Sequence, residues 1–574
     1  MRKVLPGHGA SKGNALGRAR IRLPHALEVA EERIAADAVD DELVRLHAAI
    51  AVVRGEMREM RERLHGALAH EVGEFLDLHA LLLDDPELLQ GLDGLIRTGR
   101  YGADYALRLQ RDRLASVFEG MEDAYFRSRI EDIDHVIGRV HAALHRREAE
   151  LQGVAGEILV TDTIAPAELV ELQSQGVLGI VTSGGSTLSH SAILARSLHL
   201  PLVVDAPLAL QQVNDGDVLV VDGASGLLVL EPNADDLRAF KTRQREEKRE
   251  RRQLHRLRRE PSRTRDGVDI RLYANAESRE DVAEAHALGA AGIGLYRTEY
   301  LFLQRPGLPD EEEQFRAYRD LVLGMTGRMV TIRTLDIGAD KADRSGLALR
   351  DEPNPALGLR GVRLSLSRRS VFETQLRAIV RASGYGPLRI LVPMVTDREE
   401  IKAVARLLKR VTRKLRGEGH AVAEHIPLGA MIEVPAAALA LSTLIDHIDF
   451  LSIGTNDLIQ YLLAADRGNE ALGDLHTPMH PAMLRLLSDV IATAKAHDKP
   501  VAVCGEMAGD ALFTPLLLAL GLEEFSLHPG TLLEVRRAIR AQDLSVLQGR
   551  AKALLRASDR AGIERWICNT TSAA

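Results

Sequence analysis

Arginines, carboxylates and one thiol are the side chains with chemical potential in the C-terminal half, and most of them follow short apolar runs. They are Arg297, Arg333, Arg467, Glu433, Asp457 and Cys504. An arginine presents a planar pair of donors to phosphate or carboxylate, and two carboxylates with substrate oxygens commonly hold Mg²⁺. Each residue alone could be an ordinary ion-pair member. Together they favour a site for a small phosphorylated acid.

A histidine in the N-terminal half follows a glycine-rich loop. The segment from Ser183 to Arg196 reads SGGSTLSHSAILAR, with His190 at the expected start of a helix. Glycines allow close backbone approach, and a helix N-terminus favours an anion. His190 could therefore carry a phosphoryl group on a ring nitrogen. The alternative is that Ser189 is a helix N-cap beside a histidine without function, and spacing alone leaves both interpretations open.

Apolar runs that alternate with helical stretches must position the C-terminal residues. From Val268 onward eight such runs occur: DIRLYANA, AGIGLYRTE, MVTIRTLDIG, LRILVPMV, LGAMIEVP, DFLSIGTND, PVAVCGE and EEFSLHP. Eight strand–helix repeats in about 300 residues predict a (β/α)₈ barrel over residues 266–574, with an open doubly wound sheet as the alternative.

The barrel hypothesis makes a test possible, because active sites of such barrels lie at the C-terminal ends of the strands. The expected strand ends carry Asn275, Arg297 to Glu299, Arg333 to Asp336, Met394, Glu433, Asn456 and Asp457, and Cys504 to Glu506. These ends collect arginines, carboxylates and the only thiol of the eight runs, which favours a functional interpretation.

The N-terminal half divides by its periodicity. Residues 24–150 have helical spacing, with an apolar stripe through Leu43, Leu46, Ile50, Val53 and Met57. Residues 151–230 contain short β runs (EILV, GIVT, PLVVD, DVLVVDG and GLLVLEP) and one helix, Ser191 to Leu198. The glycine-rich residues 1–23 could complete this α/β unit. We therefore predict an α/β domain from 1–23 and 151–230, with the helical segment inserted into it.

A charged linker is expected between the two halves, over residues 231–265. Thirteen Lys or Arg residues and four Glu residues lie between Arg238 and Arg265. The pattern predicts a solvated linker helix. A nucleic-acid-binding arm is disfavoured, because Phe240 is the only aromatic residue among the charges.

Length and composition exclude several protein classes. The 574 residues correspond to about four domains at ~150 residues each. A net charge of −8, from 74 basic and 82 acidic residues, argues against a chain that binds nucleic acid along its length. Two cysteines make no disulfide framework. We read no signal peptide, and the most apolar stretch, 511–522, is too short to span a bilayer. We expect a cytoplasmic protein without membrane insertion.

Nearly the whole chain resembles one family. The segments GGSTLSHSAILARSL, GIGLYRTEYLFL, LPDEEEQFRAY, IRTLDIGADK, NPALGLRGVR, MIEVPAA, LSIGTNDLIQYLLAADRGNE, CGEMAG and, in the helical part, MEDAYFRSRIEDI are similar to those of phosphoenolpyruvate-protein phosphotransferases. These proteins are Enzyme I of the bacterial sugar phosphotransferase system. Where the family usually has Gly-Gly-x-Thr-Ser-His, this chain is one residue longer between Gly184 and His190, but Ser189 to Arg196 continues in register.

The resemblance implies a reaction and a role for each residue. Such an enzyme moves the phosphoryl group of phosphoenolpyruvate to its own histidine and then to the histidine-containing phosphocarrier protein HPr, releasing pyruvate. By motif match His190 is the phosphohistidine and Cys504 the proton donor to the enolate. The substrate-binding residues would be Arg297, Arg333, Arg360, Asn456, Asp457 and Arg467, and the Mg²⁺ ligands would be Glu433 and Asp457. The helical segment would dock HPr, and the barrel would form a homodimer.

Two other functions would use part of this sequence pattern. A pyruvate phosphate dikinase or phosphoenolpyruvate synthase would share the histidine and barrel segments. These enzymes need a large nucleotide-binding domain ahead of the histidine, and the roughly 150 residues there show no phosphate-binding glycine motif. An inactive regulator that only binds the carrier would lack the histidine, arginines or carboxylates, all of which are present.

Overall fold

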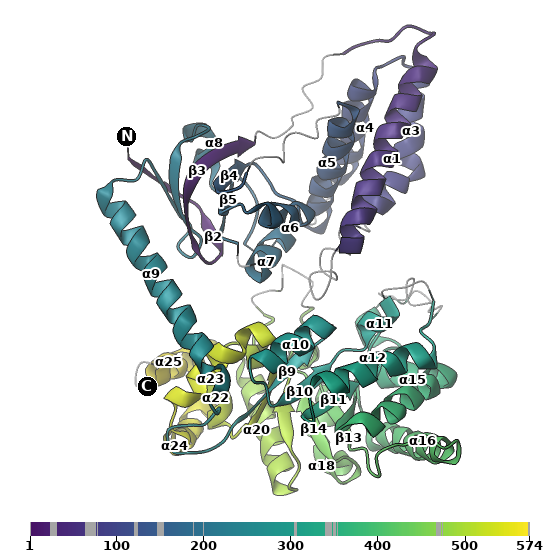
Figure 1. Ribbon diagram of the computed structural model, residues 1–574, viewed down its shortest axis with the longest axis vertical. Coiled ribbons are helices and arrows are strands. Elements are labelled where there is room, and N and C mark those ends of the chain that lie inside the picture. Colours follow the sequence, from purple (N-terminus) through teal and green to yellow (C-terminus); the bar gives the residue numbers. More distant parts are fainter. Residues whose placement is uncertain are drawn as a thin grey trace. The chain divides into compact units, whose positions relative to one another are not determined.

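The computed structural model describes most of the chain. The described residues are 2–22, 31–63, 76, 79–119, 124–145, 154–187, 189–198, 200–303, 307–338, 347, 352, 354–466, 472 and 475–571. The side chains of residues 62–63, 117–119, 124–132, 167, 190, 193, 197, 251 and 571 are outside the description. The chain forms two compact units, Met1–Arg249 and Glu250–Ala574 (Figure 1).

The second unit is a closed parallel barrel. Among the described residues its eight strands are β9 (Arg271–Ala276), β10 (Gly292–Tyr296), β11 (Met329–Arg333), β12 (Leu388–Val392), β13 (Leu428–Ile432), β14 (Phe450–Ile453), β15 (Val501–Val503) and β16 (Glu524–Leu527). Each pairs in parallel with the next, and β16 pairs with β9, Phe525 opposite Leu272, to close the ring. All eight expected runs contain a strand, so the barrel prediction is confirmed and the open-sheet alternative is wrong.

Helices surround this barrel. They are α10 (Arg279–Ala287), α11 (Glu299–Leu303), α12 (Glu311–Gly324), α14 (Gly361–Ser367), α15 (Arg369–Ala382), α16 (Arg398–Gly417), α17 (Pro435–Leu439), α18 (Leu441–Leu444), α19 (Thr455–Leu463), α20 (Pro481–Ala496), α21 (Glu506–Gly509), α22 (Thr514–Ala519), α23 (Leu532–Ala541), α24 (Leu544–Leu555) and α25 (Arg560–Thr571).

Alternation along the strands divides the apolar residues of the barrel into two sets. Ile390 and Val392 of β12 belong to the large core shared with the helices. Leu391, between them, belongs to a small separate cluster with Leu295, Met431, Phe450 and Cys504. These five residues come from five strands or strand ends, so they fill the barrel interior, and Cys504 is the member at the C-terminal end of β15.

The first unit contains a mixed sheet built from both ends of its sequence. Its order is β1 (Lys3–Pro6), β8 (Leu227–Leu230), β7 (Val218–Asp222), β3 (Asn14–Arg22), β4 (Glu157–Thr161), β5 (Gly179–Thr182), β6 (Leu202–Val204) and β2 (His8–Ser11). β3 pairs in parallel with β4, Arg20 opposite Leu159, across the intervening helical segment. The opening residues therefore complete the sheet, and the predicted fold class, an α/β domain with a helical insertion followed by a barrel, is confirmed.

Three shorter helices belong to this sheet domain: α6 (Pro166–Gln175), α7 (His190–Ser197) and α8 (Pro207–Gln212). The helical insertion contains α1 (Val39–Arg63), α3 (Pro86–Arg97), α4 (Ala103–Glu119) and α5 (Ala124–Leu144) (Figure 1). The predicted stripe of α1 is buried as expected: Leu46 and Val53 are fully buried, and Met57 is 2% exposed.

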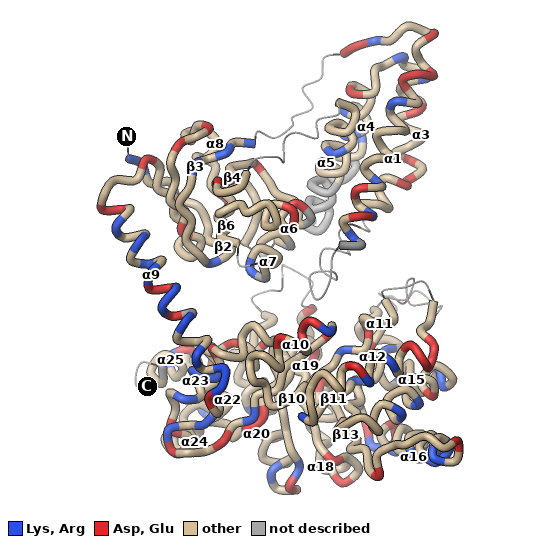
Figure 2. The backbone as a smooth tube through the Cα atoms, viewed as in Figure 1, with Lys and Arg blue, Asp and Glu red and all other residues tan. Residues whose placement is uncertain are grey.

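The charged linker forms a helix, as predicted: α9 (Ala234–Arg256), followed by a 3₁₀ turn, Leu257–Arg259. Figure 2 shows that Lys and Arg positions recur along its length. Glu250 accepts a hydrogen bond from Arg537 of α23. Phe240 is buried and so not presented for base stacking. In the described part of the chain no helix is long and apolar enough to cross a membrane.

Candidate active site at the C-terminal ends of the barrel strands

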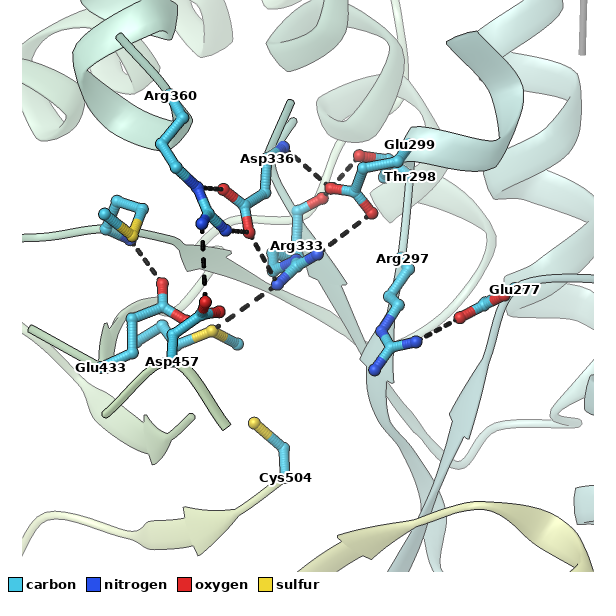
Figure 3. Close-up of polar contacts among 12 residues, drawn as sticks. Glu277, Arg297, Thr298, Glu299, Arg333, Asp336, Arg360, Glu433, Asp457 and Cys504 are labelled. Atoms are coloured by element: carbon cyan, nitrogen blue, oxygen red, sulfur yellow. Dashed lines mark hydrogen bonds and ion pairs between the residues drawn. The ribbon is translucent and has the colours of Figure 1, made fainter. Parts of the chain in front are cut away.

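Five of the side chains singled out in the C-terminal half come together where the barrel strands end (Figure 3): Arg297, Arg333, Glu433, Asp457 and Cys504. Arg333 is the last residue of β11, and Glu433 directly follows β13. Asp457 lies in the first turn of α19, which follows β14. Parallel strands carry their ends to one rim, so residues more than 100 positions apart in sequence share a site.

Asp336 joins two arginines. One of its carboxylate oxygens lies 3.1 Å from Arg333 Nη1 and 3.0 Å from Arg360 Nη2. Arg333 also lies 3.2 Å from a carboxylate oxygen of Glu299, whose other oxygen accepts a hydrogen bond from the Asp336 backbone N–H at 2.8 Å. Since all these acids are largely buried, they hold the two guanidinium groups in fixed positions, ready for a ligand oxygen.

Glu433 is a buried carboxyl held by strained backbone. Its Oε1 accepts a 2.6 Å hydrogen bond from the Met394 N–H, and Met394 has a left-handed φ of 56°, uncommon for a residue with a side chain. Gly361 packs against Met394, and a Cβ on it would lie 2.7 Å from the Met394 Cβ. Strained backbone of this kind gathers at functional sites because the surrounding structure must maintain it.

Negative charge is in excess around Glu433. Burial, and then the charges of Asp336 and Asp457, raise its pKa to about 8, against the opposing influence of Arg333. Asp457 lies 3.5 Å from Arg360 Nη1. Burial alone would lower the pKa of Arg360, but Asp336 and Asp457 hold it above its ordinary value. The site thus contains more acids than two arginines balance, which suits binding of a cation.

Arg297 and Asn456 lie at the same rim with different partners. Arg297 Nη1 donates to Glu277, and the Arg297 side chain is 42% exposed, so solvent or a ligand can reach it. The Asn456 amide makes a two-way pair with Glu506: its Nδ2 donates to Oε1 at 3.1 Å, and its Oδ1 accepts from the Glu506 N–H at 3.0 Å. This pair joins the ends of β14 and β15.

Cys504 points into the site from β15 (Figure 3). It is 3% exposed, and its Sγ donates to the carbonyl of Ile453 at 3.5 Å. Its own carbonyl accepts from Asn275 Nδ2 at 3.2 Å. Burial raises the pKa of the thiol to about 11. Arg333 and Arg297 lower that pKa, as expected from their charge, but burial outweighs them. The arginines therefore do not leave a thiolate at neutral pH in this structure.

The glycine-rich loop ends at a capped helix. His190 is the first residue of α7, and its side chain lies outside the described part of the chain. Ser189 is the N-cap: its Oγ accepts from the Ala192 N–H at 3.2 Å. Gly185 has a φ of 97°, a conformation that favours glycine. The N-cap interpretation of Ser189 is confirmed, and it is compatible with a functional His190, because a capped N-terminus still has free N–H groups.

Two residues mark the limits of the sequence prediction at this site. Arg467, expected to bind substrate, lies outside the described residues. Tyr461 was not predicted: its hydroxyl accepts from Arg360 Nη1 at 3.3 Å and donates to the Ala356 carbonyl at 2.5 Å. A signal existed, since Tyr461 is four residues after Asp457 on one helix and so shares its face.

Comparison with known proteins covers almost the entire chain. Three matches follow one another in sequence: the N-terminal domain of PEP-utilising enzymes over residues 6–129, their mobile domain over 153–226 and their PEP-binding domain over 251–544. The phosphoenolpyruvate-protein phosphotransferase of Cupriavidus necator is 44% identical over 549 residues, 93% of this chain and 94% of the relative. That of Geobacillus stearothermophilus is 40% identical over 541 residues, 94% and 93% of the two chains. A solution structure of an Enzyme I protein covers 42% of this chain and 99% of its own, at 28% identity and a TM-score of 0.36.

Proposed function

Since the chain belongs to the phosphoenolpyruvate-protein phosphotransferase family, we propose that its barrel rim binds phosphoenolpyruvate and that His190 accepts the phosphoryl group. The protein is a transferase that acts at the first step of the sugar phosphotransferase system. The observation that carries the assignment is the pair of arginines, Arg333 and Arg360, held on one carboxylate of Asp336 at the barrel rim. Preorganised cations of this kind bind phosphate and carboxylate oxygens.

Each site residue then has one task. Arg297, Arg333 and Arg360, with Asn456 and Arg467, bind the phosphate and carboxylate of the substrate. The bond between phosphorus and the enol oxygen breaks while a bond forms between phosphorus and a neutral ring nitrogen of His190. The remaining enolate takes a proton from the Cys504 thiol onto its methylene carbon, which yields pyruvate. Solvent returns the proton to sulfur, and the phosphoryl group passes from His190 to HPr.

Glu433 and Asp457 are the residues that would hold Mg²⁺. The donor set fits: two carboxylates in an acid-rich pocket are hard oxygen ligands. There is also room for an ion beside Glu433 Oε2, because residue 454 is a glycine and a Cβ there would come within 2.8 Å of that oxygen. When bound, the ion supplies positive charge against the charge that develops on the transferred group.

The cytoplasmic partner HPr is proposed to dock on the helical segment 24–150, within the domain boundaries predicted above. Support comes from apolar side chains that this segment leaves in solvent: Val44 and Val52, eight residues apart on α1, are 68% and 53% exposed. A homodimer through the barrel is supported by Leu439 of α17, which is 78% exposed. Contiguous exposed apolar patches mark interaction sites, and these side chains are the apolar contacts that each proposed interface would bury.

Labelling with radioactive phosphoenolpyruvate and Mg²⁺ tests the proposal. The wild-type protein should acquire label that is acid-labile and base-stable, as expected for phosphohistidine, and should lose it to HPr. His190→Ala should acquire none but should still bind phosphoenolpyruvate, because the barrel provides that site. Labelling that requires a nucleotide would favour a dikinase-like enzyme, and absence of label from the wild type would favour a carrier-binding regulator. Normal labelling of His190→Ala would exclude this histidine as the acceptor.

A further inference from the structure

A second group of metal-ligand side chains lies in the helical segment, remote in sequence from the residues of the proposed reaction. Asp104 is in the first turn of α4, His141 is in the last turn of α5, and His145 directly follows α5. One ligand atom from each lies within 4.8 Å of the other two. We propose that these three residues form a Zn²⁺ site in the helical segment.

The two histidines converge on the same oxygen atom. Asp104 Oδ1 lies 3.4 Å from His141 Nε2 and 2.9 Å from His145 Nε2. The histidines are four residues apart, so they share one face of α5, and their ring centroids are 4.7 Å apart. Tetrahedral Zn²⁺ with bonds of about 2.0–2.1 Å separates neighbouring ligand atoms by about 3.3 Å. The observed distances require shifts of only a few tenths of an ångström for these two pairs.

The carboxylate is oriented by a second set of contacts. Arg45 Nη2 lies 3.3 Å from the other oxygen, Asp104 Oδ2, and Arg45 is itself 3.1 Å from Glu42. With Oδ2 held by the guanidinium, Oδ1 is directed to the imidazoles. Partners of this kind fix the orientation of ligands in metal sites, and a carboxylate that binds a metal is usually hydrogen-bonded in turn.

The chemistry of the ligands selects the ion. Two imidazole nitrogens and one carboxylate oxygen suit Zn²⁺, whereas Mg²⁺ prefers oxygen ligands alone. The side chain of His145 is 41% exposed, so water can reach the group and supply a fourth ligand. Bound Zn²⁺ would fasten the end of α5 to the start of α4. Because α5 is the last helix before β4 among the described residues, the ion would stabilise the helical segment where the chain returns to the sheet.

An ordinary ion pair in the same segment provides a matched control. His47 Nε2 lies 2.9 Å from Asp93 Oδ1, the same distance as between His145 and Asp104. Among the described residues this pair has no third ligand beside it that would complete a metal site. Removing the His47–Asp93 pair should leave metal binding unchanged.

The test uses the full-length protein, stripped of metal and then kept in excess Mg²⁺ to occupy the acids of the barrel. Co²⁺, which reports its ligands by visible absorption, is titrated in and then displaced by Zn²⁺. We expect one Co²⁺ per chain in the wild type and in His47→Gln, and at least a tenfold loss of affinity in His141→Gln and in His145→Gln. Circular dichroism checks that the variants fold.

Hydrogen exchange of the wild type provides a measurement independent of any variant. Zn²⁺ in excess Mg²⁺ should slow amide exchange in α4 and α5 and leave the barrel helices unchanged, since an ion that binds only the folded state stabilises it locally. No Co²⁺ or Zn²⁺ bound in excess Mg²⁺, or equal binding by both histidine variants and the wild type, would overturn the proposal. Amide exchange in α4 and α5 that is equally fast with and without Zn²⁺ would also overturn the proposal.

Discussion

Removing the Cys504 thiol should separate substrate binding from turnover. In Cys504→Ala one sulfur atom leaves the interior cluster with Leu295, Leu391, Met431 and Phe450. We expect a loss of unfolding free energy of about 1 kcal/mol, the scale for a small buried truncation, and a protein that still folds. The arginines and acids of the site are unchanged, so phosphoenolpyruvate should bind as in the wild type.

The burial of the thiol sets its protonation state. With a pKa of about 11, roughly 0.03% of the thiol is ionised at pH 7.5, against ~9% for an ordinary cysteine. Because the pKa is raised, the thiol stays protonated as the pH rises, until about pH 11. Cys504 therefore meets the enolate as an acid at neutral pH. Losing a general acid usually slows a reaction at least ~100-fold, and we expect a slowing of this size.

Two assays measure the two directions of the step. Pyruvate formation in the presence of HPr reports turnover, and exchange of pyruvate methyl protons with deuterated solvent reports the reverse proton transfer. Cys568→Ala is the matched control, because this second cysteine is exposed on α25. It should behave as the wild type in both assays. Wild-type exchange in Cys504→Ala would refute the role of the thiol and indicate that another group or water supplies the proton.

Three further predictions concern the same site. At pH 8, iodoacetamide should alkylate Cys504 at least ~200-fold more slowly than a free cysteine peptide, as followed by mass spectrometry. Because burial raises the pKa of the thiol to about 11, the alkylation rate should keep rising to about pH 11, and a plateau near pH 8.5 would contradict this. Asp457→Ala should be inactive in the labelling assay at any practical Mg²⁺ concentration, and full rescue by added Mg²⁺ would show that it is not a principal ligand. Gly361→Ala should lower the free energy of unfolding by about 1–3 kcal/mol, since the φ of Gly361 is 58° and a Cβ would lie 2.7 Å from the Met394 Cβ. Calorimetry should show a lower melting temperature, and an unchanged one would show that the backbone relaxes freely there.

Local pattern was enough to predict most elements of the fold. The eight apolar runs are short, buried on both faces and separated by helical stretches, so each gives a clear signal that does not depend on its neighbours. Strand ends then placed Arg333, Glu433, Asp457 and Cys504 at one rim, because parallel strands in a barrel end on the same side. The stripe of α1 was equally local, since its period comes from the helix itself.

Pairing and environment were decided only by the tertiary structure. Asp336 holds Arg333 and Arg360, 27 positions apart in sequence, because the segment that leads into α14 returns to the end of β11. The pKa of Cys504 depends on how completely the barrel excludes water, which residue spacing does not report. Asp104 meets His141 and His145 only because α4 packs on α5. Sequence by itself determined which side chains could do chemistry and on which elements they lie, since those signals are local; their partners, burial and charge balance required the packed chain, because they depend on contacts between residues far apart in sequence.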